Sequence, residues 1–288
     1  PTVDEWVSKD YPELTTEYTD LFETRTSDRA FEEDMTVSGF GLASQKSEGE
    51  GIQYDTEQQG FLTRYEMLTY ALGFIVTREA FEDDKANVIA PEKARELRFS
   101  MNQTKEVIGA NVYNNGFDSA YTGGDGVEML SDVHPNVAGG TYANELAVSA
   151  DLSEAALEQA CIDIMKMDND RGLQIALMPQ SLHIPPELVF EAERILQSPF
   201  RVGTSDNDIN ALNSMGKFPG GVKVNHYFTD ADAWFIRTNV RGMKHYQRRA
   251  LEFDLDNEWD THNAKFQANE RYDFGWSDPR CIFGSPGA

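Results

Sequence analysis

The stretch LEFDLDNEWD, residues 251–260, alternates acidic and apolar side chains. Its even positions are all acidic: Glu252, Asp254, Asp256, Glu258 and Asp260. Its odd positions are mostly apolar: Leu251, Phe253, Leu255 and Trp259. A period of two places the carboxylates on one side of an extended strand and the apolar groups on the other side. The sequence therefore predicts a strand with an acidic ladder along one face.

A second alternating run returns after a turn at 260–263. Its predicted inner face is apolar: Phe266, Ala268, Tyr272, Phe274 and Trp276. Its predicted outer face is polar, on the same side as the acids: Lys265, Gln267, Asn269 and Arg271. Exposed charge pairs contribute only about 0.2–1 kcal/mol each, so this ladder does not hold the fold together. We expect it to select the surface of a partner.

Composition bounds the class of protein. The chain has 288 residues, of which 40% are hydrophobic, so it can bury a core, and its formal net charge is −24. Duplex DNA carries about one negative charge per 1.7 Å, so we do not expect a sequence-reading DNA binder, whereas a container whose wall repels DNA is compatible. No apolar run approaches the roughly 20 residues of a membrane helix. No charged-then-apolar leader opens the chain, so we expect an intracellular protein that does not enter a membrane.

Charge is unevenly distributed along the chain. Residues 1–60 hold only four bases, whereas residues 237–249 hold five: Arg237, Arg241, Lys244, Arg248 and Arg249. Complementary patches far apart in one sequence predict contacts between segments or between copies.

The order of predicted elements indicates an α+β fold. Residues 1–30 are acidic and aromatic without a sustained period, typical of an arm that packs against something else. Residues 31–84 contain two extended runs around a polar tip at 44–60, which predicts a projecting hairpin. Met35 and Val37 alternate before the tip, and the apolar residues of 68–76 alternate after it as the second arm. Residues 91–114 have helical spacing and end at Asn114-Asn115-Gly116.

A compact α/β unit is predicted over 140–240. Ser153 is placed to cap a helix, 173–179 has the pattern of a buried strand, and Pro186 opens a second helix. Two further strands are expected at 222–228 and 233–239.

No catalytic or metal-binding motif is present. The five histidines have no metal-type spacing, and the two cysteines, Cys161 and Cys281, indicate reduced thiols. The acids of 254–260 lack the central glycine and the closing glutamate of a calcium loop. There is no P-loop and no Gly-x-Ser-x-Gly. We therefore expect a structural protein without cofactor, metal or catalytic residues.

Lys46, the only lysine of the polar tip, is the one reactive candidate, and a solvated loop lysine is the simpler interpretation.

Six segments, in order, resemble a known family: DGVEMLSDVHP (125–135), LSEAALEQA (152–160), DRGLQIALMPQSLHIPPELVFEAERIL (170–196), SDNDINALNS (205–214), NHYFTDADAWFIRT (225–238) and RRALEFD with ERYDFGWSDPR (248–280). They closely resemble major capsid proteins of tailed bacteriophages, and the Mu-like major head subunit family is the best match. The resemblance implies the Hong Kong 97-like capsid fold. It implies an N-terminal arm (1–30), an extended loop (31–84), a peripheral domain with a spine helix (85–139), an axial domain (140–240) and return strands of the peripheral domain (241–288).

The resemblance also implies a function. Such subunits self-assemble into hexamers and pentamers of an icosahedral shell around double-stranded DNA, which they do not read. Portal and scaffolding proteins, with or without cement proteins, are the implied partners. The virion, assembled in the bacterial cytoplasm, is the implied location. An intracellular metal-assisted hydrolase using the acids near His262, or a phage tail or decoration subunit, remains the alternative.

In a shell, the acidic ladder would face bases on an adjacent copy: Arg241, Lys244, Arg248 or Arg249. Charged seams tolerate small shifts between copies better than interlocked apolar surfaces do. Some relatives join subunits covalently through a lysine of the extended loop. Lys46 occupies a suitable region, but no motif identifies a partner asparagine, so a crosslink is not expected.

Overall fold

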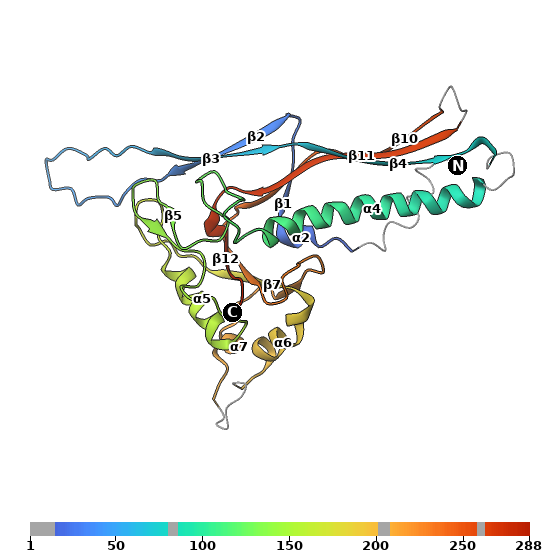
Figure 1. The fold of residues 1–288 in the computed structure, drawn as a ribbon. Helices are drawn as coiled ribbons and strands as arrows, with labels where there is room; N and C mark the ends of the chain where they lie inside the picture. The colour runs from blue at the N-terminus through green and yellow to red at the C-terminus, as the bar shows by residue number, and fades with distance from the viewer. Residues whose placement is uncertain (1–14, 80–85, 201–207, 258–262) are drawn as a thin grey trace. The chain divides into compact units, whose positions relative to one another are not determined.

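The computed structural model describes residues 15–79, 86–200, 208–257 and 263–288, and for 86–92 the backbone alone (Figure 1). The chain divides into two compact units, each built from several segments. Unit 1 takes in residues 1–32, 65–110 and 244–275, and unit 2 takes in residues 33–64, 111–243 and 276–288.

Unit 1 is built on a four-stranded sheet in the order β1-β10-β11-β4. Its strands are β1 (Glu23–Thr26), β10 (Met243–Asn257), β11 (Ala264–Trp276) and β4 (Leu68–Val76). β1 runs parallel to β10, and β4 runs antiparallel to β11. The short helix α2 (Tyr18–Leu21) precedes β1, and the long helix α4 (Ala86–Asn114) runs alongside the sheet (Figure 1).

The alternation predicted for 251–276 is confirmed where the structure describes it. Glu252, Asp254 and Asp256 are exposed, and Leu251 and Phe253 are half-buried. Leu255 departs from the pattern because it is 58% exposed. The positions 258–260 lie outside the described residues. On β11 the predicted inner apolar residues are buried, apart from a half-buried Trp276, and the predicted outer residues are exposed or half-buried.

The helix predicted at 91–114 is confirmed and is longer than expected. α4 has 29 residues, which at about 1.5 Å per residue extends on the order of 40 Å. It begins at Ala86, so Pro91 lies within the helix and not at its first turn. Ala94, Leu97 and Met101 are buried at helical spacing, and Leu97 and Met101 pack against Ala268 of β11.

The buried stripe of α4 continues with a charged residue. Lys105 follows Met101 by one helical turn, and its Nζ lies 2.5 Å from Oε1 of Glu270 on β11. Both side chains are 5% exposed. The ammonium also lies over the rings of Tyr18 and Tyr272, at 5.1 and 4.9 Å from their centroids. A buried ion pair with further partners thus joins helix and sheet, and sequence analysis assigned neither residue a role.

Unit 2 contains a four-stranded sheet in the order β12-β9-β7-β8. Its strands are β12 (Ile282–Ser285), β9 (Trp234–Thr238), β7 (Pro179–Ile184) and β8 (Val222–Val224). The helical elements are α5 (Glu154–Lys166), η2 (Pro186–Leu188), α6 (Val189–Gln197), α7 (Ala211–Met215) and η3 (Pro279–Cys281). A two-stranded sheet pairs β5 (His134–Pro135) with β6 (Thr141–Tyr142). The core gathers apolar residues from helices and sheet, including Leu157, Ile164, Leu182, Trp234 and Phe283.

Two helix predictions for this unit are confirmed. Ser153 accepts a hydrogen bond from the backbone N–H of Ala156 at 3.2 Å and caps α5, as expected of an N-cap serine. Pro186 begins η2, which leads directly into α6.

The predicted strand at 173–179 is wrong, because the strand β7 begins only at Pro179. Leu177 is buried and Ile175 packs against the core, but the Leu177 N–H bonds back to Ile175 O at 2.7 Å and makes no sheet ladder. The strand at 222–228 is also shorter than predicted. It ends at Val224, because the side chain of Asn225 accepts the Tyr227 N–H at 2.9 Å and closes a turn that contains His226.

The predicted hairpin of 31–84 has a different second arm. β2 (Phe31–Ser38) pairs with β3 (Gln58–Glu66), around a tip at 39–57 that has no regular structure. The alternation at 68–76 belongs instead to β4, which pairs with β11. Aromatic stacking explains that pairing: Tyr70 lies 4.6 Å from Tyr272 and Phe74 lies 4.7 Å from Phe266, centroid to centroid.

Replacing Lys105 alone by Met should lower the free energy of unfolding by about 3–5 kcal/mol, because it leaves the Glu270 carboxylate buried without its cation. The double variant Lys105→Met/Glu270→Leu should lose much less, since an apolar pair of similar volume needs no charge partner. Urea unfolding followed by tryptophan fluorescence measures both. A double variant as unstable as the single one would show that the pair is not coupled.

Candidate functional site

The acidic ladder consists of Glu252, Asp254 and Asp256 in the described part of the chain, and Asp254 has amide neighbours on β11. Gln267 Nε2 and Asn269 Nδ2 both lie near Oδ2 of Asp254, at 3.4 and 3.3 Å. These contacts are long and exposed. In the described residues, no basic side chain pairs with Asp254 or Asp256, so the outer end of the ladder stays negative.

The bases predicted to face the ladder on another copy have different surroundings. Arg249 is half-exposed and already pairs within its own strand, with its Nε 3.6 Å from Glu252 Oε2. Arg241 is exposed and Arg248 is half-buried. Lys244 is 8% exposed, opposite Glu23 in the β1–β10 register. Lys244 is therefore the least accessible of the four candidate bases.

The loop tip at 39–57 exposes large apolar side chains beside Lys46. Phe40, Leu42, Ile52 and Tyr54 are 59%, 83%, 69% and 90% exposed. Lys46 is exposed as well, and no described side chain engages it. Such a concentration of exposed apolar groups on one short loop is typical of a contact surface.

The base of this loop is held by two residues that sequence analysis did not single out. Asp55 Oδ2 accepts the Gly41 N–H at 2.7 Å and an Arg171 Nη1 proton at 2.6 Å. A second Arg171 nitrogen, Nη2, donates to the carbonyl of Thr56. The backbone N–H groups of Gly41 and Thr56, and then Arg171, lower the pKa of the Asp55 carboxyl.

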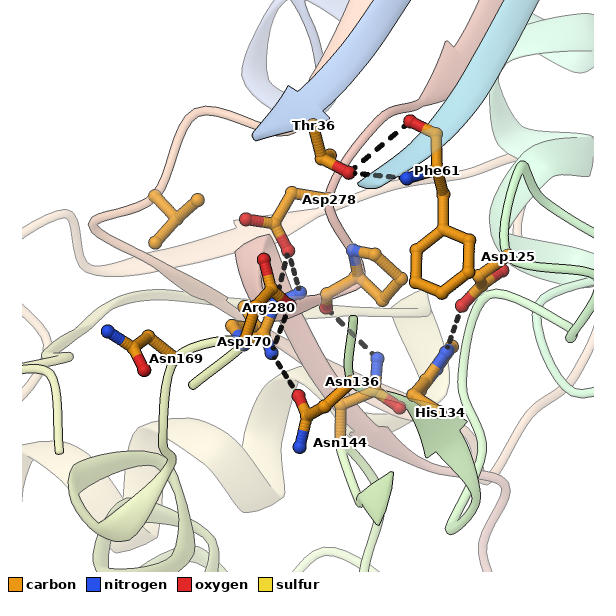
Figure 2. A network of polar contacts seen from close by, with 12 residues as sticks. Thr36, Phe61, Asp125, His134, Asn136, Asn144, Asn169, Asp170, Asp278 and Arg280 are labelled. Atoms are coloured by element: carbon orange, nitrogen blue, oxygen red, sulfur yellow. Dashed lines mark hydrogen bonds and ion pairs between the residues drawn. The ribbon is translucent and has the colours of Figure 1, made fainter. Parts of the chain in front are cut away.

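A polar network surrounds the buried side chain of Arg280 in unit 2 (Figure 2). The guanidinium is 7% exposed and lies 4.0 Å from the ring centroid of Tyr142. Its nitrogens reach oxygen atoms of four residues: Asp168 O at 2.9 Å, Asn136 Oδ1 at 2.7 Å, Asp170 Oδ1 at 3.0 Å and Asp278 Oδ1 at 3.6 Å. Arg280 therefore joins three loops of the chain at one point.

Two further polar contacts flank this network (Figure 2). His134 Nδ1 lies 2.7 Å from Asp125 Oδ2, and the His134 ring is fully buried. Asn144 donates to the carbonyls of Met129 and Pro279 at 2.8 and 3.0 Å, and its own carbonyl accepts the Ser131 N–H. A histidine, an arginine and several carboxylates thus lie close together.

The geometry of this cluster does not support catalysis. The cavity beside Arg280, lined also by Thr36, Phe61 and Asp125, has a volume of about 20 Å³, which holds about one water molecule and no substrate. Nowhere in the described residues do three or more His, Cys, Asp or Glu side chains form a group that could hold a metal ion. Within the same residues, no helix is long and apolar enough to cross a membrane.

Two other histidines, His183 and His245, are buried and uncharged at pH 7. Burial lowers the pKa of His183 to about 3, with Arg237 and Lys223 adding to the effect. Burial, and then Lys105, lowers the pKa of His245 to about 3. Both rings are therefore neutral at pH 7, consistent with the structural roles predicted for the histidines. His226, in contrast, is exposed in a turn. His262 lies outside the described residues.

Comparisons with known proteins agree with one another. A family model described as phage capsid protein matches residues 62–284. Three solved structures have a similar fold: Mycobacterium phage Che8 (10% identity, TM-score 0.55, 95% of this chain and 93% of that chain), the capsid of an empty GTA particle (12%, 0.55, 95% and 90%) and the procapsid of bacteriophage JBD30 (12%, 0.52, 98% and 72%). No curated protein matches the sequence.

Neither cysteine should react with a thiol reagent in the folded chain at pH 8. Burial raises the pKa of Cys161 to about 11, and the pKa of the fully buried Cys281 rises further, so neither forms the nucleophilic thiolate. Titration with 5,5′-dithiobis(2-nitrobenzoic acid) should find no accessible thiol before denaturation and two thiols per chain in guanidinium chloride. Rapid modification of the folded protein would contradict this assignment.

Proposed function

Because this chain belongs to the phage capsid protein family and is a structural subunit of an icosahedral shell, we propose that its copies first join into hexamers and pentamers. These capsomers then close around packaged double-stranded DNA. The chain has the Hong Kong 97-like fold and is not an enzyme. The Mu-like subgroup stays a prediction. The hydrolase and the tail or decoration subunit are set aside, because the family match covers most of the chain.

The single observation that carries the assembly proposal is the outer end of the acidic ladder. Asp254 and Asp256 lie exposed at the end of a long strand, and in the described residues neither forms an ion pair with a basic side chain. Each contact with a base on an adjacent copy would contribute little, because exposed pairs contribute about 0.2–1 kcal/mol. Repetition over every subunit of a shell makes the sum large. Arg241 and Arg248 are the bases that best suit this role, with Arg249 shared with Glu252.

The net charge supports the proposed relation to DNA. A chain at −24 repels a polyanion, so the packaged duplex would move past the wall without adhering to it. Portal and scaffolding proteins, with or without cement proteins, would complete the particle. Assembly would take place in the cytoplasm of the bacterial host.

The extended-loop and domain boundaries follow from the same proposal. The tip at 39–57, with β2 and β3, would be the extended loop, and α4 would be the spine helix of the peripheral domain. The compact part of unit 2 from 140 to 240 would form the axial domain. β10 and β11 would be the return strands, and the described part of 1–30 would be an arm that adds β1 to their sheet.

The double variant Asp254→Lys/Asp256→Lys should reduce the yield of closed shells about tenfold or more. Two weak attractions become repulsions, and about 1.4 kcal/mol corresponds to a tenfold change in an equilibrium. The fold should be retained, because Asp254 has only long, exposed contacts within the chain. Electron microscopy and sedimentation measure the shells, and circular dichroism measures the fold.

The neutral variant Asp254→Asn/Asp256→Asn serves as the matched control and should lose less. Adding Arg241→Glu and Arg248→Glu to the charge-reversed chain should recover shells if these bases meet the ladder. Normal shells from Asp254→Lys/Asp256→Lys would remove the ladder from the assembly contacts.

A further inference from the structure

In the tight turn DNDRG, residues 168–172, the consecutive side chains of Asp170 and Arg171 contact different partners. Asn169 closes the turn: its side-chain oxygen accepts the backbone N–H groups of Arg171 and Leu173, both at 2.9 Å. Gly172 follows at φ +71°, a left-handed conformation that glycine adopts without strain. The local shape of the turn is therefore fixed by its own hydrogen bonds.

Asp170 anchors this turn to the protein interior. Its Oδ1 accepts a hydrogen bond from Arg280 at 3.0 Å, and Arg280 Nε donates to the carbonyl of Asp168 at 2.9 Å (Figure 2). An arginine that is 7% exposed keeps its charge, so both contacts help to satisfy a buried cation. The backbone position of Arg171 is consequently set from within unit 2.

Arg171 reaches in the other direction, to the base of the loop tip. It donates to the carboxylate of Asp55 and to the carbonyl of Thr56, while Asp55 also accepts the Gly41 N–H. Both ends of the 39–57 segment thus meet at the Asp55 carboxylate, which Arg171 binds. The side chain of Arg171 is 18% exposed, compared with 45% for Asp55. Two hydrogen bonds from the planar guanidinium of a mostly buried arginine restrict the orientation of the loop more than an ordinary surface ion pair does.

The loop tip has no comparable attachment elsewhere. Residues 39–57 contain no strand or helix. In the described chain, Arg171 is the one residue outside β2, β3 and their connection that makes a hydrogen bond or ion pair with this segment. The orientation of the tip with respect to the rest of unit 2 should therefore depend on the contact between Arg171 and Asp55.

We propose that Arg171 is a positioning residue, which, held by the Asp170–Arg280 contact, fixes the direction in which the 39–57 tip leaves unit 2 and so presents its exposed apolar groups to a second copy of the chain. The inference rests on the proposed function, since the second copy is the partner in the shell. Its first consequence concerns the isolated subunit: without Arg171, the tip loses its fixed orientation while the core of unit 2 is unchanged.

Hydrogen–deuterium exchange of full-length subunits, before assembly, tests the first consequence. In Arg171→Ala, the amide of Gly41 and its neighbours in 39–57 should exchange about tenfold faster, a loss of roughly 1.4 kcal/mol of local protection, whereas β7 and β9 should be unchanged. Arg171→Lys, which retains the charge but not the fork, should fall between Ala and wild type. Arg194→Ala, which removes the exposed pair with Glu191 in the same unit, is the matched control and should leave 39–57 unchanged.

Shell formation by the same variants tests the second consequence. Arg171→Ala and Asp55→Asn should both lower the yield of closed shells, with Arg171→Lys partly restoring it and Arg194→Ala at wild-type level. Asp55→Asn keeps the turn intact, so it tests the same contact even if Arg171→Ala unfolds. Unchanged exchange in 39–57, or faster exchange with a normal yield of shells, would overturn the positioning role. Absence of shells from the wild-type chain would contradict the proposed function, and the exchange result would still decide whether Arg171 holds the loop.

Discussion

The buried guanidinium of Arg280 is the constraint on which the arrangement of unit 2 depends. Arginine keeps its charge at any physiological pH, so burial requires that its five N–H groups find acceptors. Asn136, Asp168, Asp170 and Asp278 supply them, and they come from three separate loops. Those loops can therefore take only arrangements that meet at one point. The strand β12 begins two residues after Arg280 and pairs with β9, so the same contact also sets where the C-terminal strand joins the sheet.

Unit 1 also buries a cation, Lys105, and pairs it with the carboxylate of Glu270. Lys105 and Glu270 meet inside an aromatic cluster, and the neighbouring Glu106 accepts the backbone N–H groups of Glu17 and Tyr18 at 3.0 and 2.8 Å. Burying charges contributes little net stability, because desolvation offsets the attraction. What such pairs supply is a single allowed register: a shift of β11 by one residue would turn Glu270 outward and leave Lys105 without its anion. A long helix on a thin sheet has few other means of fixing its register, and every copy in a shell must have the same one.

The sequence predicted most reliably what depends on period alone. The alternation of β10 and β11 and the stripe of α4 follow from neighbouring side chains, so they could be found locally. Lys105 and Glu270 also carried a signal, because each lies in phase with buried apolar residues. The second arm of the hairpin was wrong because an alternating run shows that a strand has two faces but does not say which strand it pairs with. The run at 173–178 shows the same limit, since it is partly buried without joining a ladder. Arg171 and Arg280 could not be found, because their partners come from loops that only the complete fold brings together.

A phage capsid subunit has to be attractive to its own copies only in the correct geometry, and the charge distribution of this chain suits that requirement. At −24, two copies that approach at random repel each other, and that repulsion extends over about a Debye length, roughly 8 Å at physiological salt. In the proposed assembly, contacts that place a base beside the acidic ladder, or cover Leu42 and Tyr54 on the loop tip, would overcome the repulsion only at contact. If the tip moved freely, each contact would also have to offset the entropy of ordering it. A tip that is oriented before assembly avoids that cost, so weak individual contacts are sufficient to close a lattice while remaining weak enough to be corrected when they form in the wrong place.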